Sequence, residues 1–200
     1  MTQILTILFD LDGTLVDTAP DLMNAHNHVM KKFGLHRKNL NDIKHLAGRG
    51  AWVMMQRSFR EEIKDEKIKK AMLKEFIDHY SKNIDKGSKP IKGVVDFLKW
   101  AESKKISMGI CTNKPFEMTL LVLEGLRIKS FFAGVTGGDN LPYNKPDPRH
   151  ILKTLELMKS DVSNAVMVGD SWIDVKAARN AEIPVVAVSY GYNSNPDEFL

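Results

Sequence analysis

The chain has 200 residues, of which 43% are hydrophobic and 27% charged, a composition that is ordinary for a globular protein. Its net charge of +4 comes from lysines spread along the sequence, without the basic run of a nucleic-acid arm or the roughly 20 apolar residues of a membrane span. A single cysteine, Cys111, excludes an internal disulfide, and the N-terminus lacks a signal-peptide pattern. We therefore expect a cytoplasmic protein with no nucleic-acid or membrane partner.

Five short apolar runs are typical of strands buried on both faces of a parallel sheet. In chain order they cover residues 4–9, 107–112, 132–136, 165–170 and 184–188. Helical spacing of apolar residues fills the intervals, over 94–101, 120–126, 151–158 and 175–181. Pro115 and Pro146 lie where a helix start tolerates proline. Strands alternating with helices predict an α/β fold, a Rossmann-like parallel sheet core flanked by helices.

Residues 19–85 interrupt this alternation with helical patterns alone. These patterns cover residues 22–33, 51–59 and 68–84. The simplest organisation is an α/β core formed by residues 1–16 and 88–200, with an inserted α-helical cap subdomain at residues 17–87. The expected hinges between core and cap are Val16–Pro20 and Asp85–Pro90.

Polar residues gather at the carboxyl ends of the predicted strands, where ligands of doubly wound sheets bind. They are Asp10 and Asp12, Thr112 and Asn113, Asp170 with Asp174 one helical turn later, and Lys145 before a predicted helix. Clustered carboxylates repel one another unless a cation lies among them, and oxygen ligands without histidine or cysteine suit Mg²⁺. A hydroxyl, backbone N–H groups and a lysine suit the oxygens of a phosphoryl group. Gly13 allows a sharp turn beside the two carboxylates.

An aspartate in such a site can be a nucleophile that forms an aspartyl-phosphate, and a second carboxylate can be the general acid and base. Each residue alone also has a structural interpretation. Asp-x-Asp is common by chance, Thr112 could end a strand, Lys145 could lie at the surface, and Asp170 and Asp174 could cap a helix. The position of all four segments at the ends of predicted strands favours a functional site.

The segments FDLDGTLVDT, CTNK, NKPDP and GDSWID resemble the four motifs of the haloacid dehalogenase superfamily of phosphohydrolases, and the resemblance extends from Phe9 to Asn193. It implies an α/β core with a helical cap after the first motif. The implied roles are Asp10 as nucleophile, Asp12 as general acid and base, Asp10, the backbone carbonyl of Asp12 and Asp170 as Mg²⁺ ligands, Thr112, Asn113 and Lys145 as phosphoryl-binding groups, and Asp174 as a support for Lys145 or a water-mediated metal contact. Because the dehalogenase branch lacks a carboxylate at Asp12, C–X cleavage is not expected.

Within the superfamily, the segments TNKP, GGDNLPYNKPDP, MVGDS, DVKAARNA and VSYGYN resemble the phosphoglycolate phosphatase branch, as does the loop Gly48-Arg49-Gly50-Ala51. This resemblance implies hydrolysis of 2-phosphoglycolate to glycolate and phosphate. Arg49 could bind the substrate carboxylate as a bidentate partner, or could be a surface arginine in a turn between helices. Trp172 departs from the branch, which usually has a small or polar residue there, and its ring could narrow the site or pack outward.

Other activities of the same superfamily remain open: a pyrophosphatase, a nucleotidase, a sugar phosphatase or a phosphomutase. A non-catalytic binding or regulatory protein on this fold is the alternative from a different class, although Asp10 and Asp12 are both present. We expect the partner to be a small phosphorylated metabolite and the protein to be a monomer or a homodimer.

Overall fold

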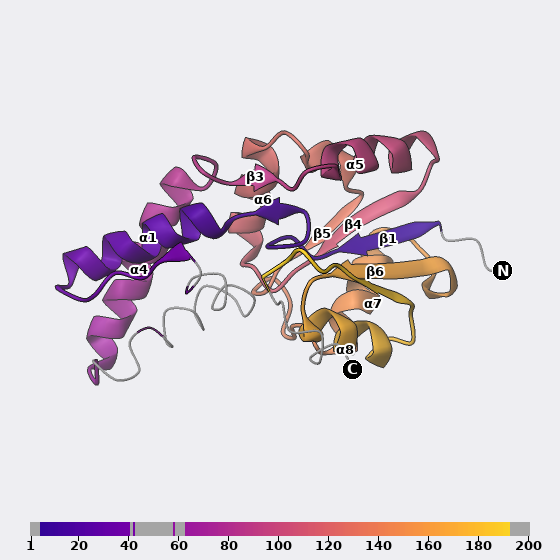
Figure 1. Cartoon of the computed structure of the whole chain (residues 1–200). Coiled ribbons are helices and arrows are strands. Elements are labelled where there is room, and N and C mark those ends of the chain that lie inside the picture. Colours follow the sequence, from indigo (N-terminus) through magenta and orange to yellow (C-terminus); the bar gives the residue numbers. More distant parts are fainter. Residues whose placement is uncertain (1–4, 41, 43–57, 59–62, 193–200) are drawn as a thin grey trace.

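The computed structural model describes residues 5–40, 42, 58 and 63–192 (Figure 1). In chain order the strands are β1 (Thr6–Phe9), β2 (Val16–Asp17), β3 (Lys89–Pro90), β4 (Ser107–Cys111), β5 (Gly134–Thr136), β6 (Ala165–Gly169) and β7 (Val185–Ala187). The α-helices are α1 (Ala19–Lys32), α4 (Glu66–Asn83), α5 (Val94–Ser103), α6 (Phe116–Gly125), α7 (Pro148–Leu157) and α8 (Trp172–Asn180). None of the helices in these described ranges is both long and apolar enough to cross a membrane.

The main sheet has five parallel strands in the order β5-β4-β1-β6-β7. β1 is central, and its Thr6 lies opposite Ser107 of β4 and Ala165 of β6. The five predicted strands are confirmed, each within two residues of its expected bounds. Since β4 and β6 are the two neighbours of β1, the residues that follow these three strands share one edge of the sheet.

Both faces of β1 are buried, which explains why its sequence is apolar without alternation. Ile7 and Phe9 belong to one hydrophobic cluster, whereas Leu8 belongs to a second cluster on the other face. The second cluster includes buried residues of α7 and α8, and the first includes buried residues of α5 and α6. Figure 1 shows α5 above the sheet and α8 below it.

The helices predicted between the strands are confirmed as α5 to α8, with one difference at the start of α7. This helix begins at Pro148 and not at Pro146. The Asp147 side chain accepts a hydrogen bond from the backbone N–H of Arg149 at 2.9 Å and so caps the helix one residue before Pro148. Pro146 therefore belongs to the loop that carries Lys145.

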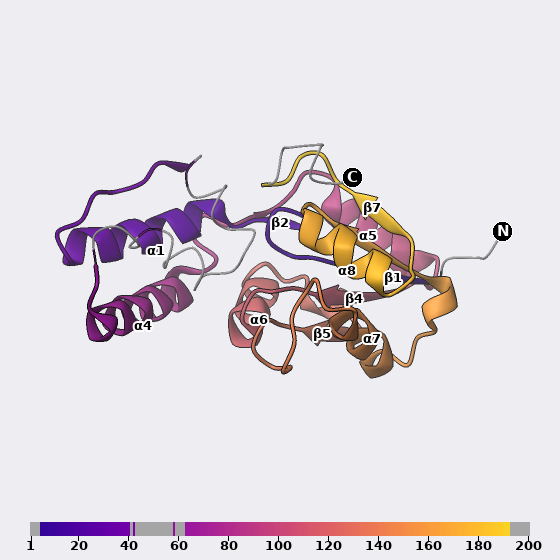
Figure 2. The ribbon, with the colours of Figure 1, turned by 90° about the horizontal axis from the view of Figure 1, so that it is seen from below.

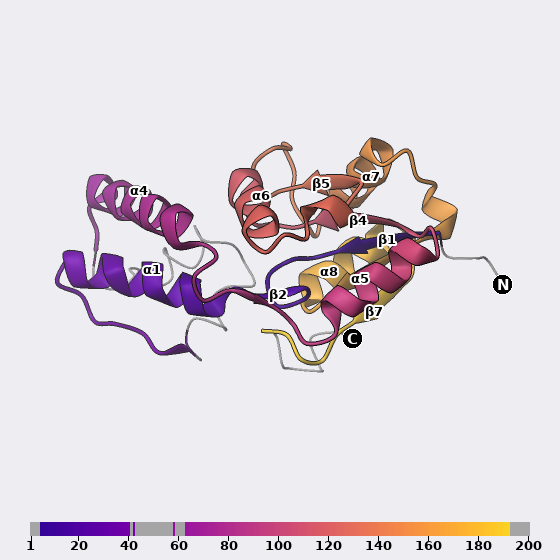
Figure 3. The ribbon, with the colours of Figure 1, turned by 90° about the horizontal axis from the view of Figure 1, so that it is seen from above.

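The helices α1 and α4 pack against each other at one end of the molecule, away from the main sheet (Figures 2 and 3). Their contact is apolar inside, where Val29 and Phe76 are buried, and polar at its margin, where His28 Nε2 lies 2.7 Å from Glu75 Oε1. This pair is the described part of the predicted helical cap. Apart from Ser58, the helical pattern predicted over 51–59 lies outside the described residues, as does Arg49.

A two-stranded antiparallel ribbon of β2 and β3 joins the two connections between the helix pair and the main sheet. The Asp21 carboxylate strengthens this junction because it accepts hydrogen bonds from the N–H groups of Gly87 and Ser88, at 2.8 and 2.7 Å. The ribbon lies within the two segments expected as hinges. We therefore keep the core boundaries of 1–16 and 88–200, and the cap boundaries of 17–87, as our proposal.

Candidate active site

Three carboxylates form a tight acidic cluster at the carboxyl edge of the sheet. Oxygens of Asp10, Asp170 and Asp174 all lie within 4.8 Å of one another. Asp170 follows β6 and is 2% exposed, while Asp174 lies in the first turn of α8 and is fully buried. Burial, together with the negative charges of Asp10 and Asp174, raises the pKa of Asp170 to about 7. The cluster therefore carries an excess of negative charge that a cation would relieve.

Asp170 is held in place by its surroundings. Its Oδ1 accepts from the Thr14 hydroxyl at 3.3 Å and its Oδ2 accepts from the backbone N–H of Tyr192 at 2.7 Å. Gly13 has a φ of +85°, and a Cβ there would lie only 2.5 Å from Asp170 Oδ2. The turn after β1 therefore requires glycine both for its backbone conformation and for the space beside this carboxylate.

Lys145 brings a positive charge into the acidic cluster. Its Nζ lies 3.0 Å from Asp10 Oδ1 and 2.6 Å from Asp174 Oδ1, and its side chain is 2% exposed. Burial disfavours the charged form, but the two carboxylates outweigh it and raise the pKa of Lys145 above its ordinary value. The surface interpretation of Lys145 is wrong, because this residue is a buried cation beside Asp10.

Asn113 fixes the loop that carries Lys145. Its Oδ1 accepts from the backbone N–H of Lys145 at 3.0 Å, and its Nδ2 donates to the backbone carbonyl of Lys145 at 2.9 Å. Both polar atoms of the Asn113 side chain therefore already have hydrogen-bond partners within the protein. Thr112, on the preceding position, is buried, and its Oγ1 accepts from the N–H of Lys114 at 3.2 Å.

Asp174 both caps the start of α8 and contacts Lys145, two arrangements that the sequence left as alternatives. Its Oδ2 accepts from the N–H and the hydroxyl of Ser171, at 3.0 and 2.6 Å, which forms a capping box at the start of α8. Its Oδ1 accepts from Lys145. Both carboxylate oxygens therefore have protein partners, and the residue links the helix start to the Lys145 ammonium.

The Asp12 side chain is not part of the three-carboxylate cluster and has partners of its own. Its Oδ1 accepts from the Thr18 hydroxyl at 2.7 Å, and both of its oxygens lie 3.1 Å from Lys114 Nζ. Lys114 Nζ also donates to the Tyr80 hydroxyl of α4 at 2.8 Å. Sequence reasoning gave Lys114 and Tyr80 no role in the site. Lys114 follows Thr112 and Asn113 at the end of the second predicted strand, and only this position could have drawn attention to it.

The Trp172 ring does not contact the carboxylates in any interaction found among the described residues. Instead, Lys176 Nζ lies over the ring, 5.9 Å from its centroid, one turn further along α8. Lys176 is exposed and Trp172 is half-buried. This contact favours the interpretation in which the ring packs outward.

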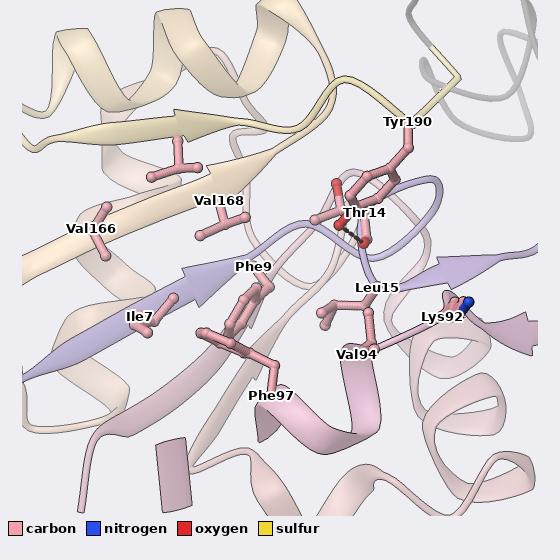
Figure 4. A pocket seen from close by; sticks show the side chains of 12 residues that line it. Ile7, Phe9, Thr14, Leu15, Lys92, Val94, Phe97, Val166, Val168 and Tyr190 are labelled. Atoms are coloured by element: carbon pink, nitrogen blue, oxygen red, sulfur yellow. Dashed lines mark hydrogen bonds between the residues drawn. The ribbon is translucent and has the colours of Figure 1, made fainter. Parts of the chain in front are cut away.

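An apolar hollow of about 470 Å³ lies on the face of the sheet that carries Ile7, Phe9 and Val168 (Figure 4). Phe97 of α5 forms part of its wall. Although Thr14 connects its margin to Asp170, the residues that line it include no carboxylate. The acidic cluster, and not this hollow, therefore has the groups needed for chemistry on a phosphoryl group.

Comparisons with known proteins agree with this geometry. The family model of haloacid dehalogenase-like hydrolases matches residues 7–188. A phosphoglycolate phosphatase from Agrobacterium fabrum is 41% identical over 191 residues, covering 94% of this chain and 82% of the relative. Another from Caulobacter vibrioides is 40% identical over 197 residues, covering 98% of this chain and 83% of the relative.

A solved structure agrees over nearly the whole chain. The crystal structure of a predicted phosphoglycolate phosphatase from Haemophilus somnus matches with a TM-score of 0.91 and 31% sequence identity, covering 98% of this chain and 89% of that one. Together with the family match and the parallel sheet that carries the acidic cluster, this similarity confirms the resemblance expected from the four motifs. The chain belongs to the haloacid dehalogenase-like hydrolase family.

Proposed function

We propose that the protein is a Mg²⁺-dependent phosphatase that hydrolyses 2-phosphoglycolate to glycolate and phosphate through an aspartyl-phosphate on Asp10. The observation that carries the proposal is the Asp10 carboxylate, which lies 3.0 Å from the buried Lys145 ammonium and next to the buried Asp170. Support for the substrate comes from the relatives named phosphoglycolate phosphatase that are 41% and 40% identical to this chain.

The donor atoms of the cluster fit a hard divalent cation, because they are carboxylate oxygens brought close together where burial disfavours their charges. Phosphatases of this superfamily generally use a divalent metal. In our proposal the ligands are Asp10, the backbone carbonyl of Asp12 and Asp170. Asp174 serves Lys145 instead, since both of its oxygens already accept hydrogen bonds. When bound, Mg²⁺ would supply positive charge to the oxygens of the transferred phosphoryl group.

The protein groups divide the reaction into two steps. In the first, an oxygen of Asp10 attacks phosphorus, the bond to the glycolate oxygen breaks, and Asp12 gives its proton to that oxygen. In the second, Asp12 takes a proton from a water molecule, which attacks phosphorus and releases phosphate from Asp10. Lys145 and the Thr112 hydroxyl hold the phosphoryl oxygens throughout, with the backbone of Asn113 beside them.

Arg49 completes the proposal as the group that binds the carboxylate of the substrate, although it lies outside the described residues. Arg49→Ala should raise KM for carboxylate-bearing phosphates more than for neutral phosphates. Equal increases for both classes would contradict a carboxylate contact.

Phosphate release from a panel of substrates, with and without Mg²⁺, tests the function. The panel holds 2-phosphoglycolate, pyrophosphate, a nucleotide and sugar phosphates, and the wild type is compared with Asp10→Asn. We expect Mg²⁺-dependent release with a preference for 2-phosphoglycolate, lost in Asp10→Asn. The control is Asp96→Asn, the same chemical change at an exposed position of α5, which should retain activity.

The outcomes separate the chemistry from the substrate. Release of phosphate from none of the compounds would overturn the enzymatic proposal and favour a binding or regulatory protein. A preference for pyrophosphate, a nucleotide or a sugar phosphate would overturn the substrate assignment alone. Conversion of one sugar phosphate isomer into another, without release, would identify a phosphomutase.

A further inference from the structure

Lys114 is a second buried lysine at the carboxyl edge of the sheet, and it joins the core to the cap. Its Nζ lies 3.1 Å from both oxygens of Asp12 and 2.8 Å from the Tyr80 hydroxyl. The Nζ atom is also 4.7 Å from the centroid of the Tyr80 ring. Asp12 and Lys114 follow strands of the core, whereas Tyr80 belongs to α4, so the ammonium is shared by two separate parts of the fold.

Tyr80 is firmly attached to the helix pair. It is fully buried, and its ring stacks on Phe76 of the same helix with centroids 5.7 Å apart. Burial, with the negative charges of Asp12 and Asp21, raises the pKa of Tyr80 well above its ordinary value. Its hydroxyl is therefore neutral and accepts the hydrogen bond from Lys114. Because the ring is fixed within the helix pair, the position of this oxygen follows the position of α4.

The Lys114 ammonium has few alternative partners. An ammonium has three N–H donors, and here they face two carboxylate oxygens and one hydroxyl. Since the side chain is 3% exposed, little water can replace a lost partner. A displacement of Tyr80 would leave the ammonium short of an acceptor and so change how Lys114 holds Asp12.

Asp12 is restrained from both sides by this arrangement. Lys114 holds its two oxygens, and Thr18, which precedes α1 at the hinge, donates to Oδ1 at 2.7 Å. The Asp12 side chain is 13% exposed, so water reaches it although the lysine is covered. A carboxylate that must present a proton to a leaving group requires a defined direction, and these contacts define it.

We propose that Lys114 and Tyr80 are positioning residues for Asp12. Tyr80 fixes the Lys114 ammonium from the cap, and Lys114 orients the Asp12 carboxylate for proton transfer to the leaving oxygen. The inference rests on the proposed function, because it requires the general acid role of Asp12. A direct contact between Lys114 and substrate is disfavoured by its burial and by the three acceptors around its ammonium.

The dependence of the reaction on the leaving group tests this role. The glycolate oxygen is a poor leaving group that needs a proton, whereas the phenolate of p-nitrophenyl phosphate departs without one. The parameter kcat/KM reports the steps up to loss of the leaving group. General acid catalysis contributes about 10²- to 10⁴-fold, so Lys114→Met should lower kcat/KM for 2-phosphoglycolate at least about ten-fold more than for p-nitrophenyl phosphate.

Tyr80→Phe removes a single oxygen and keeps the stacked ring, so it provides a second, milder variant. We expect the same selective loss for 2-phosphoglycolate, at about three- to ten-fold, since one of several contacts to Lys114 is removed. If Tyr80 acts through Lys114, the double variant should lose no more than Lys114→Met alone. Lys176→Met, the same chemical change as at Lys114 but at an exposed position of α8, should leave both substrates unaffected.

Three results would contradict the inference. They are unchanged kinetics in both Lys114→Met and Tyr80→Phe, equal losses for the two substrates in a folded variant, and additive losses in the double variant. If Lys114→Met does not fold, Tyr80→Phe alone decides between selective and equal losses. A wild-type protein that releases phosphate from neither compound would overturn the proposed function, and this inference with it.

Discussion

Two buried lysines at the same edge of the sheet differ in which parts of the molecule supply their partners. Lys145 and Lys114 are both buried, and each contacts one of the two aspartates that follow β1. Lys145 has both of its carboxylate partners in the core, Asp10 and Asp174. Lys114 has one partner in the core and one on α4 of the cap.

This difference separates two tasks that hydrolysis of a phosphate ester with a poor leaving group requires, which are holding the phosphoryl group and protonating the leaving oxygen. The Lys145 ammonium would hold the phosphoryl group, which is common to every phosphate ester, and its position depends on core residues alone. The Lys114 ammonium adjoins Asp12, whose proton would serve the leaving group in the proposed mechanism, and the position of this ammonium depends on the cap. We infer that the core fixes the chemistry on phosphorus and that the cap influences the departure of the leaving group.

Lys145→Met should have the largest effect of the substitutions at this edge of the sheet. It removes the ammonium that offsets two negative charges, those of Asp10 and of the fully buried Asp174, which should lower the free energy of unfolding by about 3–5 kcal/mol. Loss of a preorganised charge on the phosphoryl oxygens should lower kcat/KM by about 10³-fold, for 2-phosphoglycolate and p-nitrophenyl phosphate alike. Urea unfolding and steady-state kinetics measure the two effects.

Lys114→Met is the matched control for stability. Asp12 is 13% exposed and keeps the Thr18 hydroxyl, so its carboxylate retains partners when the lysine is removed. We expect a smaller loss of stability than in Lys145→Met. An equal loss in the two variants would contradict the distinction between a core lysine and a shared one.

Asp174→Asn tests how the core alone positions Lys145. The substitution keeps the shape of the side chain but removes the negative charge that holds Lys145 at 2.6 Å. Loss of a group that orients a site residue typically costs about 10- to 100-fold in activity, and we expect a decrease of this size in kcat. In our proposal Lys145 acts on the phosphoryl group, so alkyl and aryl phosphates should be affected equally. A loss confined to 2-phosphoglycolate would contradict this assignment.

The sequence predicted most of the fold because its strands are apolar runs bounded by turns and helices. It did not predict the ribbon of β2 and β3, since each strand has only two residues and carries no periodicity. It placed the start of α7 at Pro146 because proline is favoured there, but the Asp147 cap decides the start at Pro148.

The gathering of Asp10, Asp170 and Lys145 could also be predicted, because strand ends in a parallel sheet meet at one edge. The contacts of Asp12 could not be predicted. Lys114 lies 102 residues from Asp12 and 34 residues from Tyr80, and the pairing depends on how α4 packs against the core. The sequence pattern indicates only that Tyr80 is one of the apolar residues at helical spacing.

The stabilising effect of Mg²⁺ should depend on pH, which tests the core side of the comparison. In the metal-free folded protein the pKa of Asp170 is raised to about 7, above its value of 3.8 in the unfolded chain. The resulting contribution to stability is complete below about pH 4 and is lost as the pH rises through 7. If Mg²⁺ binds the ionised carboxylate, as we propose, it should raise Tm more at pH 8 than at pH 5.5.

The measured quantity is the difference in Tm with and without Mg²⁺ at each pH. This difference is needed because burial lowers the pKa values of His26 and His150 to about 4, so these residues destabilise the folded protein below pH 6.5. The pH dependence of Tm alone would mix their effect with that of Asp170. In Asp170→Asn the pH dependence of the difference should disappear. An equal Mg²⁺ effect at both pH values in the wild type would contradict the proposed ligand.

Tyr192→Phe gives the smallest expected effect and tests a connection between core and cap that involves neither lysine. The Tyr192 hydroxyl accepts from the N–H groups of Thr18 and Ala19 at 2.6 and 2.8 Å and donates to Asp17 at 2.9 Å, so it satisfies donors at the start of α1. Removing this buried hydroxyl should lower the free energy of unfolding by about 1–3 kcal/mol. Its backbone N–H, which holds Asp170, stays in place.

Tyr190→Phe is the matched control, because Tyr190 is 56% exposed and its hydroxyl donates only to the backbone carbonyl of Thr14, at 3.1 Å, among the described contacts. We expect its stability to change by less than about 0.5 kcal/mol in urea unfolding. Tyr192→Phe should leave the ratio of kcat/KM for 2-phosphoglycolate to that for p-nitrophenyl phosphate unchanged, since the Lys114 contacts remain. A selective loss for 2-phosphoglycolate would instead show that the hinge, and not Lys114 with Tyr80 alone, orients Asp12.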